Sequence, residues 1–600
     1  MTSSRDYSYY KEHEQDVKLK DITSSEQNKD IMQKLRDGDP DFTSLYIILN
    51  NDINDNEEEF FVLEGDDLDW LGYFVGESKS LKFLRLSCYP FPPVGLLEGI
   101  CRNRSIQDLE FSGKIVDTTF IHLAPFFGKN DNLTKLTLGC DRVGSDECAQ
   151  YFLMALHKCN SLKHLCFGVS ADGSQFSDEA FNNIIRVLHS QTELERLDFD
   201  EQFLGRDACA TLSNTLRLGG MKKLRTLDLT SNYIDDDGLL SLVAGMEHCQ
   251  NLDDLSLYGN EIRVAGLRSL SSFLQSESCR LESLNLGHLH IDDEGAIVLA
   301  TGLMDYTLLK NLNLSHNIIG DAGASVLVSA LSAAANESLL NLQIKDNRFS
   351  EDGIRSLSAL IQQSEGSCLK LLDLGGWFRD ADHEAVARIL ANALTNNTSL
   401  ISLGYTIPES GEEAFSRLLC DTSSINNIYS SNHTLEIIGN LDFYQDDDIT
   451  NQDIKRYLSW NRSTRHLEPR QRQLVPMCKV LFHYPDLADM NMKPFYKWKL
   501  KFLPLVADWL FRASAIRNWL DESVKVFERR ELSGLYKFIR GVPLLVANGY
   551  WSQQLKQIQV KKRNFDEAEK QLLEILSKKR KLEEEEMQVL HRLGGKRESD

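Results

Sequence analysis

The chain has 600 residues, with 66 basic and 89 acidic side chains and a formal net charge of -23. Residues 451–600 contain 30 Lys or Arg and 19 Asp or Glu, a net charge of +11, which leaves -34 for residues 1–450. Phosphate backbones repel a chain this acidic, so we expect no nucleic-acid partner. No run of about 18 apolar residues occurs, so we expect no membrane span and no membrane partner.

The twelve Cys are scattered singly, without a C-x-x-C pair or a His/Cys pair at zinc-ligand spacing. This pattern is typical of free thiols in a reducing compartment. The N-terminal residues also lack the apolar core of a signal peptide. We therefore expect a cytoplasmic protein with no metal and no cofactor.

The N-terminal 80 residues divide into two parts. Residues 1–25 are polar and are predicted to be disordered. Residues 26–80 are predicted to form a cap, because FTSLYIIL (42–49) is typical of a strand and DDLDWLGYFVGES (66–78) of a helix.

The central part of the chain is an internal repeat. The pattern L-x-x-L-x-L recurs thirteen times over 354 residues, with a mean interval of about 29.5 residues. The copies start at Leu81, Ile106, Leu133, Leu162, Leu194, Leu224, Leu252, Leu281, Leu309, Leu339, Leu369, Leu400 and Leu435. The clearest copies add an Asn and a further apolar residue, as in LRTLDLTSNYI from Leu224.

Each repeat combines a short strand with a helix. A small residue follows the strand, as at Gly238, Gly266 and Gly295, and apolar residues then recur at intervals of three and four. We expect this glycine to allow a close approach of helix to strand. The predicted fold for residues 81–445 is an α/β leucine-rich-repeat solenoid, a horseshoe of about 13 repeats of about 29 residues, with parallel strands inside and helices outside.

These long, helix-bearing repeats resemble the ribonuclease-inhibitor-like class of leucine-rich-repeat proteins. That class includes cytosolic inhibitors, the sensor arms of immune receptors and the GTPase-activating protein of Ran. The resemblance covers about 60% of the chain and implies protein binding. Two functions follow from it: a non-enzymatic protein-protein interaction scaffold, or a regulator of GTPase-activating type for a small GTPase.

Much of the acid in the repeats lies just before the helices. Examples are Asp235 to Asp237, Asp292 to Glu294, and Asp321. Carboxylates at these positions accept hydrogen bonds from free backbone N–H groups and oppose the positive end of the helix. We interpret them as helix caps.

On the concave face, strand side chains that alternate with the core leucines are free for function. Asp198 and Asp200, Asp228, and Asp254 come from three consecutive repeats, with Tyr258 beside them. An amide-rich run follows in the next repeats: Asn285, Asn311, Asn313, Asn341 and Gln343. This acidic patch is either a solvated surface or a dock for a protein partner with a basic surface, held by salt-sensitive attraction.

Residues 451–600 form a basic region with five of the seven Trp. In KPFYKWKLKF the aromatic residues Phe495, Trp498 and Phe502 fall on one helix face and lysines on another, which favours an amphipathic helix over a nucleic-acid stripe. We predict an all-α domain that closes the solenoid or carries a ligand of its own.

Residues 564–593 are predicted to be helical. A heptad fit suggests a coiled coil, but Lys579 and Glu586 interrupt the apolar column, which favours a single docked helix. The run Lys578, Lys579, Arg580 and Lys581 is either a solvated helix face or a nuclear-localisation patch. A further hypothesis is self-association, with the basic domain of one molecule meeting the acidic face of another.

The sequence contains no phosphate-binding loop, no H-E-x-x-H zinc motif and no G-x-S-x-G nucleophile elbow. Carboxylates on an open sheet also lack a pocket that would shift their pKa values toward catalysis. We therefore predict that the protein is not an enzyme.

Overall fold

A computed structural model gives the fold. It describes residues 7–483 except for short segments at 49–58, 64–65, 88–91, 115–121, 124–125, 128–129, 143–145, 170–176, 203, 334–337, 363–367, 376–377, 379–380, 442–448 and 464–473. The chain divides into two compact units, Met1–Arg465 and His466–Asp600. The predicted coiled coil at 564–593 and the run Lys578 to Lys581 lie outside the described residues.

The described residues of the first unit form one parallel sheet of fifteen strands, arranged in chain order except that β2 is outermost. The strands are β1 (Ser44–Ile48), β2 (Glu59–Phe61), β3 (Phe83–Ser87), β4 (Asp108–Lys114), β5 (Lys135–Arg142), β6 (His164–Val169), β7 (Arg196–Asp200), β8 (Thr226–Asp228), β9 (Asp254–Ser256), β10 (Ser283–Asn285), β11 (Asn311–Asn313), β12 (Asn341–Gln343), β13 (Leu371–Asp373), β14 (Ser402–Gly404) and β15 (Ile437–Gly439).

The helices of the described residues are α1 (Tyr7–His13), α2 (Glu26–Asp37), α3 (Leu68–Glu77), α4 (Val94–Arg102), α6 (Asp146–Lys158), α7 (Asp178–Val187), α8 (Arg206–Arg217), α9 (Asp236–Met246), α10 (Val264–Leu274), α11 (Asp293–Leu303), α12 (Asp321–Ala333), α13 (Glu351–Gln362), α14 (His383–Leu394), α15 (Glu412–Leu419), α16 (Ile425–Ser430), α17 (Gln452–Ser463) and α18 (Leu474–His483). Short 3-10 turns occur at Leu19–Asp21, Leu188–Ser190 and Glu409–Gly411. Within this part of the chain, no helix has both the length and the apolar character needed to cross a bilayer.

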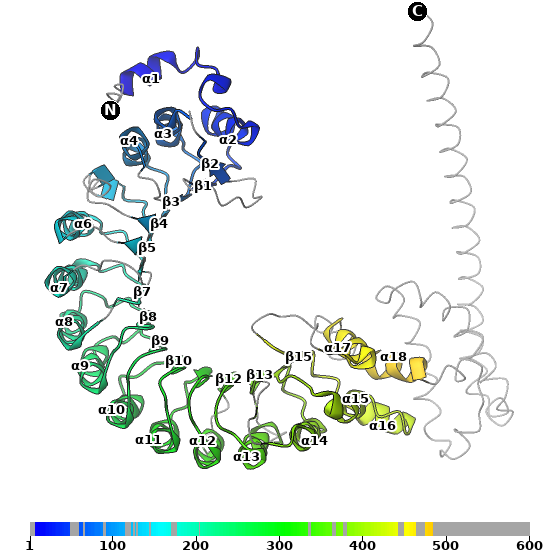
Figure 1. Ribbon diagram of the computed structural model, residues 1–600. Helices are drawn as coiled ribbons and strands as arrows, with labels where there is room; N and C mark the ends of the chain where they lie inside the picture. Colours follow the sequence, from blue (N-terminus) through cyan, green and yellow to red (C-terminus); the bar gives the residue numbers. More distant parts are fainter. Residues whose placement is uncertain are drawn as a thin grey trace, which may run out of the picture. The chain divides into compact units, whose positions relative to one another are not determined.

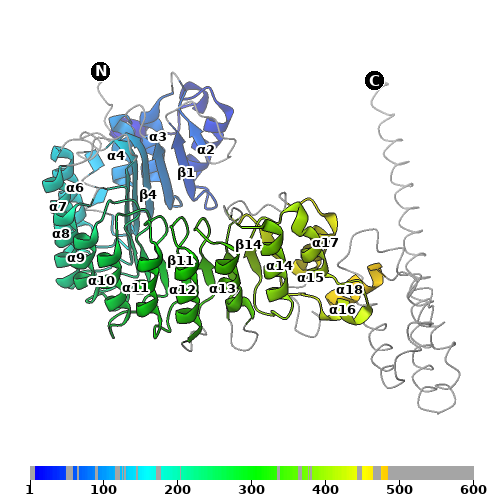
Figure 2. The same ribbon diagram turned by 60° about the horizontal axis from the view of Figure 1, so that its bottom comes forward.

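The repeat fold is confirmed. Strands line the inner side of an arc and helices its outer side (Figure 1), and successive helices stack side by side (Figure 2). Each of the thirteen predicted repeats supplies one strand, β3 to β15. The core is made of the repeated leucines, such as Leu227 and Leu255, which are fully buried. Each repeat places the equivalent leucine of its strand in the core. The strands β7, β8 and β9 therefore pair without a shift in register.

The asparagine of the repeat connects neighbouring repeats. Asn260 Oδ1 accepts hydrogen bonds from the backbone N–H groups of Asn232 (3.1 Å) and Ile234 (2.9 Å) in the preceding repeat. Its Nδ2 donates to the carbonyl oxygens of Leu229 and Leu257, both at 2.8 Å. Asn260 is buried, so these bonds satisfy polar groups that water cannot reach.

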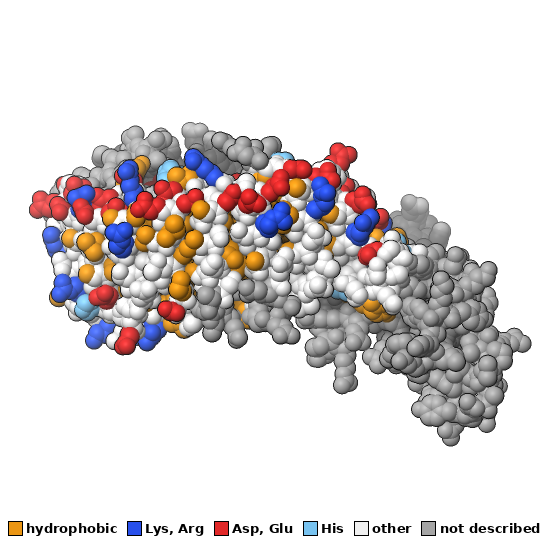
Figure 3. All heavy atoms as spheres, turned by 90° about the horizontal axis from the view of Figure 1, so that it is seen from below, with side chains coloured by type: hydrophobic (Ala, Val, Ile, Leu, Met, Phe, Trp, Pro, Cys, Tyr) orange, Lys and Arg blue, Asp and Glu red, His pale blue; other side chains and the backbone are white. Residues whose placement is uncertain are grey.

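The acids before the helices act as caps, in two ways. Asp235 and Asp292 accept from the N–H groups of Gly238 and Gly295 at the start of their own helices, both at 2.9 Å. Asp293, by contrast, lies in the first turn of α11 and accepts from Gly323 N, at the start of α12 (2.9 Å). Acidic side chains gather along one edge of the convex face (Figure 3).

The glycines after the strands allow close packing, as expected, and some of them also face a carboxylate. A Cβ added at Gly323 would lie 2.7 Å from Asp293 Oδ1, and one at Gly266 would lie 2.6 Å from Asp236 Oδ1. The carboxylates belong to the preceding repeat. These glycines therefore make room for the apolar residue that follows the strand, such as Ile291 at Gly295 and Ile319 at Gly323, and at Gly266 and Gly323 also for the carboxylate of the preceding repeat.

Residues 7–13 are helical, which differs from the disorder expected over 1–25. Tyr10 is buried, and its ring meets Trp70 of α3 edge-on at a centroid distance of 4.9 Å. Tyr7 packs against Tyr73 at 5.0 Å, and Tyr73 Oη donates to Glu14 (2.9 Å). The aromatic side chains of α3 fix this helix, a tertiary contact that the local composition does not reveal.

The C-terminal boundary also differs from the expected one at 451, because α17 belongs to the first unit. Asn461 Nδ2 donates to Leu435 O (2.6 Å), and Arg462 donates to Glu436 O (3.1 Å). These groups lie in the last repeat, beside β15. Helix α17 therefore closes this end of the solenoid, while residues 484–600 of the basic region lie outside the described residues.

Candidate protein-binding site on the concave face

The acidic patch predicted from the sequence is assembled by three neighbouring strands. Asp198 of β7 pairs in register with Asp228 of β8, and Asp254 of β9 pairs with Thr226 of β8. Asp200 lies two residues beyond Asp198, on the same face of β7. All four carboxylates are half-buried. The structure thus brings together Asp198, Asp200, Asp228 and Asp254 on the concave face, which we call the acidic patch.

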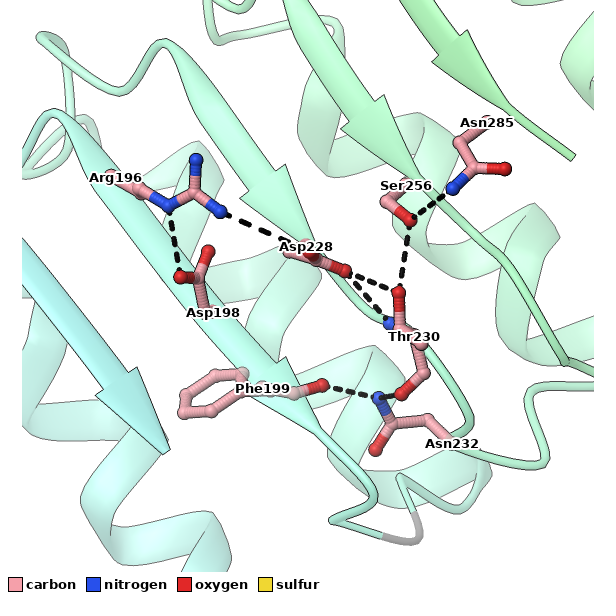
Figure 4. A network of polar contacts seen from close by, with 8 residues as sticks. All are labelled: Arg196, Asp198, Phe199, Asp228, Thr230, Asn232, Ser256 and Asn285. Carbon is pink, nitrogen blue, oxygen red and sulfur yellow. Dashed lines mark hydrogen bonds and ion pairs between the residues drawn. The ribbon is translucent and has the colours of Figure 1, made fainter. Parts of the chain in front are cut away.

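An arginine lies within the patch. Arg196 Nε donates to Asp198 Oδ2 at 2.9 Å, and its Nη2 lies 4.0 Å from Asp228 Oδ2 (Figure 4). Arg196 was not predicted to belong to the patch, although its position two residues before Asp198 on one strand predicts a shared face. The patch therefore holds four carboxylates and one guanidinium, and a negative charge of three remains when all are ionised.

A chain of hydrogen bonds runs from the patch into the amide-rich run (Figure 4). Thr230 Oγ1 donates to Asp228 Oδ1 (2.6 Å) and lies 2.9 Å from Ser256 Oγ. Asn285 Nδ2 donates to the same Ser256 Oγ (3.2 Å). These contacts hold the side chains of three neighbouring repeats in fixed positions, so the surface is organised before any partner arrives.

The charge of the patch is poorly compensated. The Oδ1 atoms of Asp198 and Asp200 are buried and accept no hydrogen bond from the described part of the chain. Burial raises the pKa of Asp200 to about 6, with the negative charges of Glu201, Asp228 and Asp198 adding to the effect. Burial likewise raises the pKa of Asp198 and Asp254, although Arg196 partly offsets it at Asp198. A cation placed here would relieve this cost.

Tyr258 lies at the edge of the patch, but its ring turns toward the following repeat. Its centroid lies 5.8 Å from that of His288. A Cβ added at Gly287 would come within 2.7 Å of Tyr258 Cδ2, so this glycine gives the ring its space. Tyr258 therefore extends the site along the solenoid and does not cover the carboxylates.

Two kinds of chemistry are not favoured at the described residues of the site, metal binding and thiol catalysis. Among the described residues, no group of three or more His, Cys, Asp and Glu side chains is placed to hold a metal ion. Cys166, whose thiol lies in β6 beside Asp198, has its pKa raised to about 12, mainly by burial and also by the Asp198 charge. A thiol in this environment stays protonated and is a poor nucleophile.

Known proteins match this chain along its repeats. A family model described as "Leucine Rich repeat" matches residues 220–243, 277–300 and 307–328. NACHT, LRR and PYD domains-containing protein 5 of Mus musculus is 29% identical over 51% of this chain and 26% of its own length. Ribonuclease inhibitor of Mus musculus is 31% identical over 36% of this chain and 40% of its own length.

A solved internalin (inlF) from Listeria monocytogenes aligns with 64% of this chain and 96% of its own, with 18% identity and a TM-score of 0.36. Together, the thirteen repeats, the family match and the sequence relatives support a leucine-rich-repeat protein of ribonuclease-inhibitor-like type. The expected resemblance is thus confirmed. Repeats of this kind indicate a protein-interaction scaffold. The chain spans about a quarter to two fifths of the length of the curated relatives that it matches.

Proposed function

We propose that this protein is a non-enzymatic scaffold that binds a protein partner with a basic surface at the acidic patch. The observation that carries the proposal is the excess negative charge of the patch: it holds four half-buried carboxylates and one arginine, and burial raises the pKa of Asp198, Asp200 and Asp254. Each raised pKa means that the ionised carboxylate is poorly solvated in the free protein and lowers its free energy of unfolding. Folding stability therefore does not explain why these carboxylates are present. A lysine or arginine of a partner would form ion pairs with these carboxylates and so offset the cost of their burial on binding.

The acids at the helix starts do not support binding in the same way. Asp235 and Asp293 already accept backbone hydrogen bonds, and these bonds explain their presence. The acidic patch is different because its side chains cap no helix. Binding that rests on such a charge is expected to be fast and salt-sensitive, since electrostatic attraction governs association more than final affinity.

Charge reversal tests the proposal. Affinity purification from cell extract would compare the full chain with Asp198→Lys/Asp228→Lys and with Glu247→Lys/Glu277→Lys, which makes the same charge change at exposed positions just after helices α9 and α10. We expect proteins that the wild type and the control retain at low salt, that elute as salt rises, and that the patch variant loses. Equal retention by the two variants would contradict the proposal.

A further inference from the structure

The amide-rich run continues the concave face beyond the acidic patch. Asn285 of β10, Asn313 of β11 and Gln343 of β12 pair in register, and Asn311 pairs in the same way with Asn341. All five residues are half-buried. The run therefore forms two short rows of neutral amides across three neighbouring strands, without a Lys or Arg among them.

The first of these rows occupies a position at which the turn after the strand uses an acceptor. Asn285 and Asn313 each accept, through Oδ1, a hydrogen bond from the backbone N–H two residues further along the chain, at 3.2 and 2.9 Å. Asp228 and Asp373 accept in the same way at the equivalent positions of their repeats, at 3.1 and 3.2 Å. An oxygen of either residue type closes this turn. The turn therefore does not explain why asparagine stands in two repeats and aspartate in two others.

The choice of residue decides which chemical group remains for a partner. A backbone N–H only donates, so the atom that accepts from it is the amide oxygen, and the NH2 groups of Asn285 and Asn313 point away from the turn. Asn285 Nδ2 donates to Ser256 Oγ (Figure 4). Asn313 Nδ2 and the Gln343 side chain form no hydrogen bond within the described part of the chain. The amide-rich run thus presents free donors, whereas the acidic patch presents acceptors.

The surroundings of the amide-rich run favour a neutral acceptor over an anion. The acidic patch adjoins one end of the run, and at the other end Asp373 of β13 pairs in register with Gln343. Lys310, which precedes Asn311, forms an ion pair with Glu282 at 2.7 Å. A carboxylate or phosphate of a partner would therefore be repelled from both ends of the run. A carbonyl oxygen accepts the same hydrogen bonds and carries no charge.

We infer that the amide-rich run binds main-chain carbonyl groups of an extended segment of the partner, whose Lys or Arg side chains occupy the acidic patch. This inference rests on the proposed function and specifies the partner. Carbonyl groups in helices and sheets are already hydrogen-bonded, whereas those of an extended segment are free to accept. The partner therefore offers an extended basic segment and not the surface of a folded domain.

The two surfaces are continuous and of a length that one short segment covers. A chain of hydrogen bonds links Asp228 of the acidic patch to Asn285 of the amide-rich run (Figure 4). Strands β8 and β12 are four strand spacings apart, roughly 19 Å at about 4.8 Å each. About six residues of extended chain cover this distance. A segment that places a cation on Asp228 can therefore place a carbonyl group beside Gln343.

The test uses isothermal titration calorimetry of the full chain at low salt with two probes. Acetylated and amidated nona-arginine brings cationic side chains and main-chain carbonyl groups, whereas spermine brings cations and no carbonyl group. The run variant is Asn313→Ser/Gln343→Ser, because serine stands at the equivalent position of β9. The control, Asn426→Ser/Gln250→Ser, makes the same changes at exposed positions outside the strands. Thermal unfolding verifies that all variants are folded.

We expect the run variant to bind nona-arginine about tenfold more weakly than the wild type, as the loss of one or two hydrogen bonds requires. Its affinity for spermine should stay within about twofold of the wild type, since spermine offers the amides no acceptor. The control should match the wild type with both probes. Gln343→Ser alone leaves the turns unaltered and should weaken nona-arginine binding by about threefold.

Unchanged binding of nona-arginine by the run variant and by Gln343→Ser would overturn this inference. An equal loss of nona-arginine and spermine would overturn it too, because the acidic patch and not a carbonyl contact would then have changed. The proposed function fails differently: the wild type would not bind nona-arginine, or Asp198→Lys/Asp228→Lys would bind it as well as Glu247→Lys/Glu277→Lys does. The two failures are therefore distinguishable.

Discussion

Asp236 lies in the first turn of α9, yet its Oδ1 accepts a hydrogen bond from Gly266 N at the start of α10, at 2.8 Å. The same oxygen accepts from Arg263 N, also at 2.8 Å. Asp293 of α11 repeats this contact with Gly323 of α12. A carboxylate in one repeat therefore satisfies the free N–H groups of the next, and part of the acid of the solenoid holds neighbouring repeats together.

This relationship predicts a specific loss of stability. Asp236→Ala should lower the free energy of unfolding by about 1–2 kcal/mol, the cost of a lost helix cap. The neighbouring Asp237→Ala is a matched control: that side chain is 62% exposed and forms an ion pair with Arg206 at the surface. Such a pair contributes about 0–1 kcal/mol. Urea unfolding monitored by circular dichroism would compare the two, and equal losses would contradict the capping role.

A second prediction concerns the close crossing of α3 and α4. A Cβ added at Gly99 would lie 1.8 Å from Gly72 O, so the two helices meet backbone to backbone. Gly99→Ala should destabilise the fold by about 1–3 kcal/mol through overpacking, although alanine is the better helix former by about 1 kcal/mol. Gly168→Ala is the control, because a Cβ there meets nothing within 4 Å. If Gly99→Ala left the thermal unfolding temperature unchanged, this tight crossing would be ruled out.

The pKa of Asp200 predicts how stability depends on pH. Burial raises it from 3.8 to about 6, so between these values the folded protein holds a proton that the unfolded chain has released. The contribution of Asp200 to the free energy of unfolding therefore falls as pH rises from about 4 to 6, and it stays lower above that range. Asp200→Asn should be more stable than wild type at pH 7.5 by about 1–2 kcal/mol, a value reduced for solvent screening.

The difference in free energy of unfolding between wild type and Asp200→Asn should disappear below about pH 4, because residue 200 is then neutral in both proteins. Urea unfolding at pH 4, 5, 6 and 7.5 measures it. Glu277→Gln, at an exposed loop position, is the control and should shift little at any pH. A variant that is less stable than wild type at pH 7.5 would show that the Asp200 carboxylate is well compensated after all.

The leucine spacing was sufficient to predict the solenoid. It also predicted that Asp198 and Asp228 are neighbours, because each repeat adds one parallel strand in register with the last. It could not predict the reach of Asp236 to Gly266, since that contact depends on how far one helix is displaced relative to the next. The helix at Tyr7–His13 was missed for a similar reason. Its stability comes from Trp70 and Tyr73, some sixty residues away in the chain.

The C-terminal end of the solenoid supplies the last prediction. Asn432 Nδ2 donates to Asn397 O of the preceding repeat at 3.1 Å. Asn461 Nδ2 donates in the same way to Asn432 O at 3.5 Å, and also to Leu435 O at 2.6 Å. Both asparagines are buried. Helix α17 therefore continues the hydrogen bonding of a regular repeat beyond the last strand, and its removal would expose the edge of β15.

Asn461→Ala would leave the carbonyl of Leu435 buried without this donor, at a cost of about 1–3 kcal/mol. In a repeat protein the loss should be local, because each repeat is stabilised chiefly by its neighbours. We expect faster hydrogen exchange and earlier proteolysis in β14, β15 and α17, with little change near β7. Asn426→Ala, at an exposed position in α16, should leave hydrogen exchange and proteolysis of these elements unchanged. Uniform destabilisation from β3 to β15 would instead show that the solenoid unfolds as one unit.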